Sequence, residues 1–490
     1  MPEAQPSGLF IIDKPQGVTS FDAVAAVRGA LHIKKVGHAG TLDPMATGAL
    51  VIAFGHATRL LNAIVEHDKT YEATIRLGLA TTTDDAEGDV ILRENADAVA
   101  SRWRQLAAGG AVQSDAVESG AADLGSAEIA SAGDDGVWRD LLTRTIGEHF
   151  TGDIEQVPNA FSAIKINGQR AYDLAREGKD VELKARPVTI SEFTVLGVRA
   201  GVVAGERSDE PLQERVIAGF PSAQPHPSGW PGWSGSGSAT AEAMASNVIP
   251  IPVLDVDVRV SCSSGTYIRA LARDLGGELG VGGYLTRLRR TRVGRFALPD
   301  DTSGLITPES LVETRTHTVT AHVETKTFTN REGQTVTRNK CVLDTPDAMA
   351  GEERRAWLLG HALTMEQAAR GAMPVLEITA EEAAELRFGR RIERVLAKGV
   401  QAVAIVPPAH SPAHDEPAVE SGDATDTGTN MNNDALQGRA AEPVSAEPHG
   451  DAVRRSGVAA VPRRATADVV AIIERANAHQ AKPATVFPAA

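Results

Sequence analysis

Three long stretches of this 490-residue chain lack the apolar periodicity that a helix or strand needs in order to join a core. They are rich in Ala, Gly, Ser, Pro and acidic residues, which is the composition of disordered insertions. Together they carry −13 of the net charge of −15, so the rest of the chain is close to neutral. The protein must therefore fold from the segments between them, and its acidity does not exclude a nucleic-acid partner. The stretches are about 94–137, 205–248 and 409–465.

The remaining segments alternate between strand and helix patterns, which predicts a mixed α+β fold. Thr19 and Ser20 are placed to cap a helix that continues to Leu31. Residues 69–78 alternate between apolar and polar side chains, as in a half-buried strand. Further strands are predicted from Gly8 to the Pro15 turn and at 49–54, 160–166, 188–203 and 251–261, and further helices at 57–65, 138–150, 169–177 and 266–279.

A small β-rich unit is predicted at the C-terminal end of the chain. The third insertion interrupts this unit instead of forming a tail. Before it, the polar, Thr-rich residues 314–356 have weak strand character, and we expect another insertion of uncertain structure there. The unit comprises strands at 374–378, 400–405, 468–473 and 483–487 and a helix at 380–388.

No apolar run approaches the roughly 20 residues that span a bilayer, and the first ten residues lack the pattern of a signal peptide. The two cysteines, Cys262 and Cys341, lie far apart and match no metal-binding spacing. We therefore expect a cytoplasmic protein with two free thiols and no metal. Nothing in the sequence calls for an oligomer, so we expect a monomer.

The glycine-bounded segment 37–48 isolates one carboxylate, Asp43, just before an apolar run. An Asp in a turn commonly bonds its own backbone. Three glycines and His38 in these twelve residues favour a site instead, because glycines cluster where the backbone approaches something closely. Asp43 is a candidate nucleophile or base that would need a fixed cation to stay ionised. Arg269, at a predicted helix start, is the candidate partner, with a solvated Arg as the alternative.

Tyr71 and Tyr267 are two of four tyrosines, and each lies beside a polar motif. Each either packs in the core or offers a stacking face to a flat ring. His38 is a candidate base, metal ligand or wedge beside a nucleic-acid base, or a loop His without a role. The run 287–295 places five Arg in nine residues. It predicts phosphate contact, since Arg forks bind phosphate oxygens, with a solvated charged face as the alternative.

The acidic segment 83–89 superficially suggests a calcium loop. An EF-hand counted from Asp85 needs a Glu at its twelfth position, which is Ala96 here. We interpret the segment as a turn.

Seven short motifs occur in an order that resembles the bacterial tRNA pseudouridine-55 synthases of the TruB family. They span most of residues 8–296, and the ordered set is more specific than any single motif. The motifs lie at 13–17, 37–48, 69–71, 157–165, 186–187, 264–269 and 288–290. The resemblance implies a mixed, largely antiparallel sheet in a catalytic domain at 8–305, a connecting region at 306–370 and a small PUA-like RNA-binding domain at 371–490.

The resemblance also implies that uridine 55 in the T-loop of tRNA is isomerised to pseudouridine with no metal or cofactor. The target atoms are inaccessible in a stacked loop, so the base must first be flipped out. Asp43 would be the nucleophile, Arg269 its ion-pair partner, and Tyr71 would stack on the uracil and handle a proton. On the substrate-binding side, Tyr267 and Leu288 would line the uracil pocket, His38 would occupy the space that the base leaves, and Lys14 with Pro15 would support the loop.

Two other classes of function stay open at this point. A phosphatase of the haloacid-dehalogenase type would attack phosphate with Asp43, but it places a second Asp two residues on, where this chain has Met45. A non-catalytic RNA-binding or tRNA-chaperone module would use the same pocket and arginine run without needing Asp43.

Overall fold

The structure is a computed structural model, and it describes most of the chain outside the predicted insertions. The second and third predicted insertions lie almost wholly outside the described residues, as do residues 111–134 of the first. The described residues are 5–91, 96–110, 135–206, 248–303, 317–346, 349–408 and 467–489, apart from positions 163, 167, 180, 182, 302 and 331.

The large sheet at the centre of the fold contains eleven strands. They are β1 (Gly8–Lys14), β2 (Val36–Ala39), β3 (Thr47–Phe54), β4 (Lys69–Leu77), β7 (Gly152–Gln156), β10 (Arg186–Glu206), β11 (Val248–Cys262), β12 (Gly283–Val293), β13 (Phe296–Ala297), β14 (Thr318–Thr329) and β15 (Thr335–Leu343). Their order is β15-β14-β1-β3-β12-β4-β11-β10-β7, with β2 beside β3 and β13 beside β12. Among these strands, β1 and β14 pair in parallel, as do β3 and β12, and the other neighbours are antiparallel. The prediction of a mixed, largely antiparallel sheet is confirmed.

Strand β4 is buried on both faces, although its alternating sequence predicts one solvated face. Its polar side chains Thr70 and Thr74 are buried like its apolar ones. The Thr74 hydroxyl donates to Asp257 at 2.7 Å, and the Thr70 hydroxyl hydrogen-bonds that of Ser261 at 3.0 Å. Strand β11 therefore supplies partners for these groups, and a buried polar group that is hydrogen-bonded is tolerated.

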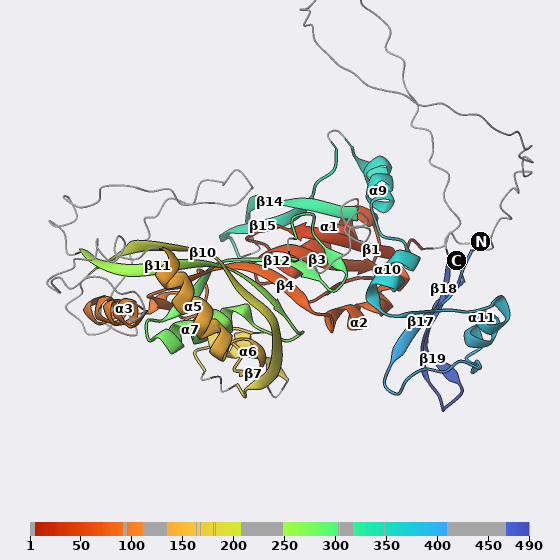
Figure 1. The fold of residues 1–490 in the computed structure, drawn as a ribbon. Helices are drawn as coiled ribbons and strands as arrows, with labels where there is room; N and C mark the ends of the chain where they lie inside the picture. Colours follow the sequence, from red (N-terminus) through yellow and green to blue (C-terminus); the bar gives the residue numbers. More distant parts are fainter. Residues whose placement is uncertain are drawn as a thin grey trace, which may run out of the picture.

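Helices cover the large sheet, and two of them begin or end at the predicted signals. Helix α1 (Ser20–Leu31) begins at the predicted cap, where Thr19 and Asp22 form a capping box. Helix α7 (Ile268–Leu279) ends at Gly280, whose φ of +71° is the left-handed conformation that favours glycine. Figure 1 places α7 near β10 and β11, together with α3 (Ala96–Gly110) and α5 (Asp135–His149).

The prediction of an insertion at about 94–137 is wrong for its first part, because residues 96–110 form helix α3. Val99 and Trp103 of this helix are buried in the main core. The Trp103 indole packs edge-on against Trp138 of α5 with ring centroids 5.4 Å apart, and its N–H donates to the Pro252 carbonyl at 3.2 Å. The one-turn spacing of Val99 and Trp103 is the helical signal that the acidic composition masks.

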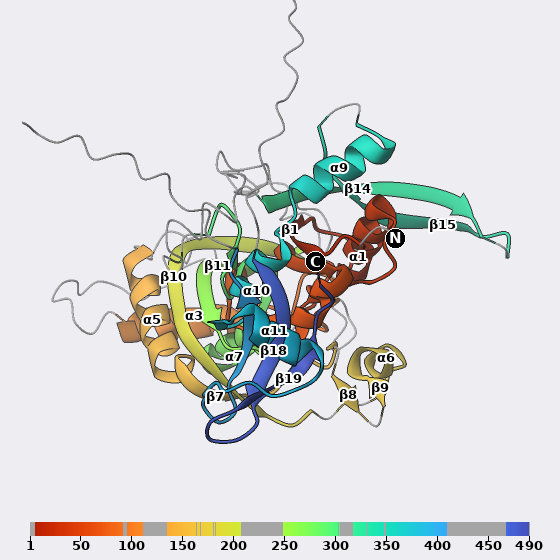
Figure 2. The same ribbon diagram turned by 90° about the vertical axis from the view of Figure 1, so that its right-hand side faces the viewer.

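The predicted insertion at 314–356 is also wrong where the structure describes it. Strands β14 and β15 form a hairpin, and α9 (Gly351–Gly360) follows. Val319, Cys341 and Leu343 at the root of the hairpin are buried in the main core, whereas its outer part is exposed. Figure 2 shows β14 and β15 extending past α1 at the edge of the molecule. The parallel pairing of β14 with β1 joins segments about 300 residues apart, which no local pattern reveals.

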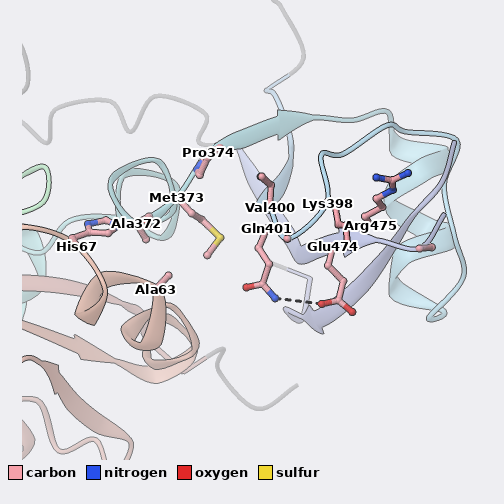
Figure 3. A pocket seen from close by; sticks show the side chains of 12 residues that line it. Ala63, His67, Ala372, Met373, Pro374, Lys398, Val400, Gln401, Glu474 and Arg475 are labelled. Atoms are coloured by element: carbon pink, nitrogen blue, oxygen red, sulfur yellow. Dashed lines mark hydrogen bonds between the residues drawn. The ribbon is translucent and has the colours of Figure 1, made fainter. Parts of the chain in front are cut away.

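A second, four-stranded sheet forms the small unit near the C-terminus. Its order is β16 (Val375–Glu377), β17 (Gln401–Val406), β18 (Asp468–Arg475) and β19 (Ala481–Val486), and α11 (Ala380–Arg387) packs on it. Val406 pairs with Asp468, so strands on both sides of the third insertion belong to one sheet, as predicted. Helix α10 (Met365–Ala372) leads into this unit. A cavity of about 770 Å³ lies at the junction, and no residue of the 37–48 loop lines it. Its lining includes His67, Met373 and Gln401 (Figure 3).

Shorter elements complete the described part. A 3₁₀ turn at Gly55–Leu60 leads into α2 (Leu61–Val65) and replaces the single helix predicted at 57–65. The extended segment predicted at 160–166 is a strand only at its end. Across the described ranges, every helix is too short or too polar to cross a membrane. The remaining elements are β5 (Ala80–Thr81), β6 (Val90–Ile91), β8 (Lys165–Ile166), β9 (Gln169–Arg170) and α6 (Ala171–Arg176).

Candidate active site

The glycine-rich loop between β2 and β3 presents Asp43 beside Arg269 of α7. Arg269 Nε lies 3.0 Å from Asp43 Oδ2. The Arg269 side chain is 6% exposed and that of Asp43 is 36% exposed, so a buried cation supports a carboxylate that a ligand can reach. The two residues expected from the sequence to pair are thus in contact, although they are more than 200 residues apart in the chain.

Backbone groups on both sides of Asp43 are held by hydrogen bonds. The Ser20 hydroxyl accepts from the Leu42 N–H at 2.8 Å and donates to the Leu42 carbonyl at 3.1 Å. The Pro44 carbonyl accepts from the Gly17 N–H at 2.8 Å and from Lys14 Nζ at 3.4 Å. Each such bond contributes about 1 kcal/mol net, and together the four restrict where the carboxylate can lie.

Arg290 of β12 holds the rest of the loop and accounts for a glycine in it. Its guanidinium group is 1% exposed and donates to the carbonyls of Ala49 at 2.8 Å and Gly40 at 3.0 Å. Gly48 has a φ of +102°, and a Cβ there would lie 2.2 Å from the Arg290 carbonyl oxygen. Strands β3 and β12 therefore approach each other at a distance that requires glycine at position 48.

Arg269 is fixed by a second carboxylate and two carbonyl groups. Its Nη1 lies 3.3 Å from Asp85 Oδ2, and Asp85 is 3% exposed. It also donates to the carbonyls of Thr83 and Phe161, each at 2.9 Å. All three nitrogens of the guanidinium group are thus engaged, and these contacts hold it in an orientation that directs Nε at Asp43.

The charge state of Asp43 reflects opposing influences. Burial raises the pKa of the Asp43 carboxyl above its ordinary value, because desolvation disfavours the charged form. The positive charge of Arg269 opposes this shift, and the negative charge of Asp85 adds to it. The ionisation of Asp43 therefore depends on Arg269.

Two tyrosines lie within the electrostatic reach of Asp43. Burial raises the pKa of both Tyr71, on β4, and Tyr267, just before α7, and the Asp43 charge contributes to both shifts. Both phenols therefore stay protonated at neutral pH. Gln156 fixes the backbone of Tyr267, because its side-chain oxygen accepts from the Tyr267 N–H at 2.8 Å and its amide group donates to the Tyr267 carbonyl at 3.0 Å.

Leu288 and His38 lie on β12 and β2, two strands that each pair with β3. Leu288 on β12 is paired with Ala73 on β4, so it faces the same side of the sheet as Tyr71. A cavity of about 570 Å³ beside the loop is lined in part by Leu288 and Met45. Burial, and then the positive charge of Arg290, lower the pKa of His38 on β2, so its imidazole is neutral at neutral pH.

Lys14 lies beneath the Asp43 loop. It is fully buried, and its ammonium group donates to the carbonyls of Val18 at 2.6 Å and Pro15 at 2.9 Å as well as to that of Pro44. Burial lowers its pKa to about 8. Lys14 thus supports the loop, as expected, and its role in substrate binding stays a prediction.

The arginine run at 287–295 is structural where its contacts are defined. Arg289 donates to both oxygens of Asp13 at 2.9 Å and to Asp300 at 2.8 Å. Arg292 donates to the Thr70 hydroxyl at 3.0 Å, and Arg290 holds the loop as described. The prediction of phosphate contact is wrong for Arg290 and Arg292, which are buried and bonded within the protein, whereas Arg289 is paired with Asp13 of β1 and with Asp300.

Sequence reasoning misses three residues that order this site. It assigns Asp85 to a turn and Ser20 to a helix cap, and it gives Gln156 no role. Each acts by binding a group that is distant in sequence: Arg269, Leu42 and Tyr267, respectively. Only the acidic cluster around Asp85 carries a signal that could have been followed.

Comparisons with known proteins identify the family of this fold. The family model described as TruB family pseudouridylate synthase (N terminal domain) matches residues 28–108 and 126–206. The model described as tRNA pseudouridylate synthase B C-terminal domain matches residues 269–325, ahead of the small four-stranded sheet. The expected PUA-like character of that small unit therefore stays a prediction.

Curated relatives cover most or all of the chain. It is 61% identical over 485 residues to tRNA pseudouridine synthase B of Bifidobacterium longum (strain DJO10A), covering 99% of both chains. It is 38% identical over 386 residues to the protein of the same name from Arthrobacter sp. (strain FB24), covering 79% of this chain and 82% of that one. The fold and these matches define an isomerase of the pseudouridine-synthase class. The chain belongs to the TruB family of pseudouridylate synthases.

Proposed function

We propose that this chain is a tRNA pseudouridine synthase that converts uridine 55 in the T-loop to pseudouridine, with Asp43 as the nucleophile. The names of the relatives support tRNA as the substrate. The observation that carries the proposed mechanism is the accessible Asp43 carboxylate held 3.0 Å from the buried Arg269 on a hydrogen-bonded loop.

The reaction needs no co-reactant. The bond between uracil N1 and ribose C1′ breaks, a bond between C5 and C1′ forms, C5 loses its proton and N1 gains one. Asp43 attacks the flipped nucleoside as a carboxylate, and the Arg269 charge keeps it ionised against the effect of burial. Because the site is preorganised around Asp43, little reorganisation accompanies the attack.

The surrounding side chains suit a flat, extruded base. Tyr71 stacks on the uracil, and its protonated phenol handles a proton, while Tyr267 and Leu288 line the pocket. Stacking on an aromatic ring is worth ~1–3 kcal/mol, which offsets the few kcal/mol that extrusion costs. His38, neutral by virtue of its lowered pKa, occupies the space that the base leaves without adding charge.

The competing functions fit the site less well. A phosphatase would need a second carboxylate at position 45, where the buried Met45 lies. A binding module for a polyanion would gain nothing from the accessible carboxylate of Asp43, which repels phosphate.

The Asp43→Asn variant tests the proposal, because it removes the charge and keeps the shape. We expect no detectable tritium release from a T-stem-loop labelled at uridine C5, with RNA affinity within a few-fold of that of the unaltered protein. Asp274→Asn is the matched control, since the Asp274 side chain lies on α7 and is also 36% exposed. Near-normal turnover by Asp43→Asn would refute the nucleophile, and pseudouridine mapped to another tRNA position would refute the proposed target.

A further inference from the structure

The outer face of the β14–β15 hairpin carries a cationic surface that the site does not use. Side chains at paired positions of an antiparallel hairpin lie on the same face, as do those two residues apart. Lys326 pairs with Arg338, and Phe328 pairs with Val336. Lys340, two residues beyond Arg338, lies on this face too. Lys326, Phe328, Arg338 and Lys340, all exposed, are called here the basic hairpin face.

Across the paired positions of the hairpin, the three positive charges on this face have one carboxylate beside them, Glu324, which lies directly opposite Lys340. Lys326 and Arg338 lie directly opposite each other, an arrangement that is destabilising unless an anion is present. Lys326 Nζ lies 4.0 Å from Glu324, at the outer limit of an ion pair. Within the described part of the chain, neither Arg338 nor Lys340 has an ion-pair partner. A face with three positive charges and one negative charge favours a polyanionic ligand.

The hairpin projects from the end of the sheet that carries Asp43. Strand β14 runs parallel to β1, with Thr320 level with Asp13. Strand β1 ends one residue later beneath the Asp43 loop, whereas β14 continues to residue 329. At about 3.3 Å per residue, the end of β14 lies about 26 Å beyond the end of β1, and the paired positions from 324/340 to 328/336 lie about 10 to 23 Å beyond it. Figure 2 shows this overhang beyond α1.

A hydrogen-bonded connection ties the hairpin to the loop. The Asn339 side-chain amide donates to the Gly17 carbonyl at 2.9 Å, and the Gly17 N–H donates to the Pro44 carbonyl at 2.8 Å. Asn339 alternates with Arg338 and Lys340, so it faces the loop while they face outward. The basic hairpin face therefore has a fixed place relative to Asp43.

We propose that the basic hairpin face binds phosphates of the substrate tRNA outside the T-loop while the target uridine lies at Asp43. This inference rests on the proposed function. Arg and Lys recognise phosphates, and the exposed ring of Phe328 lies among them, where it meets a sugar or an unstacked base. Since the face lies about 10 to 23 Å along the hairpin from the end of β1, and none of its side chains contacts Asp43, it contributes to binding and not to the chemical step.

The triple variant K326Q/R338Q/K340Q tests this proposal on two RNAs, full-length tRNA and a minimal T-stem-loop. With full-length tRNA we expect KM to rise at least tenfold and kcat to stay unchanged. The slope of log Kd against log salt should fall by about 2 to 3, because up to three phosphate contacts are lost. With the minimal T-stem-loop both KM and kcat should be unchanged.

The charge-conserving variant K326R/R338K/K340R is the matched control and should behave like the unaltered protein. Thermal unfolding of both variants establishes that the hairpin folds, and removing the opposed charges should not lower Tm. Unchanged KM and salt slope with full-length tRNA would overturn the proposal and leave the face to an acidic protein. An equal rise in KM for both RNAs would also overturn it, because the charges would then act at the T-loop. If the unaltered protein modified neither RNA, the proposed function would fail, while Kd for full-length tRNA would still test the hairpin.

Discussion

The Asp85 carboxylate lies 3.3 Å from the same Arg269 guanidinium group that pairs with Asp43. One buried cation thus serves two carboxylates, of which Asp85 is 3% exposed and committed to the fold. Arg269 lowers the pKa of Asp43, whereas Asp85 raises it. A substitution at either Arg269 or Asp85 should therefore change the pKa of Asp43, the proposed nucleophile.

Two substitutions should shift the pH dependence of turnover in opposite directions. The proposed reaction needs ionised Asp43, so kcat/KM should fall as the pH drops through the raised pKa of Asp43. Arg269→Gln should move this acid limb to higher pH, and Asp85→Asn should move it to lower pH. Both variants should also lose turnover because the geometry is loosened. Measured pH profiles that shift in the same direction would contradict this assignment.

Glycine at position 48 should be irreplaceable, unlike glycine at position 29. Gly48→Ala forces a Cβ to within 2.2 Å of the Arg290 carbonyl oxygen at a φ of +102°, and we expect a loss of about 3 kcal/mol or more in unfolding free energy. Gly29→Ala lies within α1 and meets nothing within 4 Å. It should stabilise the protein by about 0.5–1 kcal/mol, because alanine favours a helix. Denaturant unfolding of both variants measures the contrast; equal effects would be inconsistent with the close approach of β3 to β12.

Burial of Lys14 should make stability depend on pH. Its pKa is about 8 in the folded protein, against an ordinary lysine value of 10.5, so between these values the unfolded chain binds more protons. The unfolding free energy of the unaltered protein should therefore rise relative to that of Lys14→Met by about 2 kcal/mol from pH 7 to 9.5. Urea unfolding at several pH values gives this difference. A constant difference would mean that folding does not lower the pKa of Lys14.

Arg289 should matter for stability and not for RNA binding. Arg289→Ala leaves Asp13 without its two hydrogen bonds and should cost about 1–3 kcal/mol. The salt dependence of tRNA affinity should be unchanged, in contrast to the expected effect of K326Q/R338Q/K340Q. A flatter salt slope in the Arg289 variant would restore the phosphate role that the sequence suggests.

The elements that the sequence predicts well are those with local signals. The capping residue Thr19 and the stop at Gly280 locate α1 and α7, because both act within one turn of the helix. The β14–β15 hairpin could not be predicted from the sequence, because it lacks such local signals. Its exposed strands have little apolar alternation, and the β1 pairing that holds Thr318 in the sheet is entirely non-local.

The same division applies to the site. Asp43 and Arg269 each lie in a motif with glycines, and a nucleophile calls for a cation, so the pair could be inferred. The role of Asp85 could not be predicted, because it depends on Arg269 lying between Asp43 and Asp85 and contacting both carboxylates. The arginine run illustrates the reverse error, since charge density alone does not reveal that Arg289 and Arg290 lie in a central strand.

Val406 and Asp468 are partners on neighbouring antiparallel strands, so the chain leaves the small sheet and re-enters it at the same place. The length of chain between them is not fixed by the sheet, and the closure entropy changes by only about 0.6 kcal/mol per doubling of that length. A tight turn could join these strands, and so could a foreign domain with adjacent ends. A fluorescent protein inserted between these two strands should therefore leave the small sheet and Asp43 unchanged. Such a fusion would allow the enzyme to be followed in living cells.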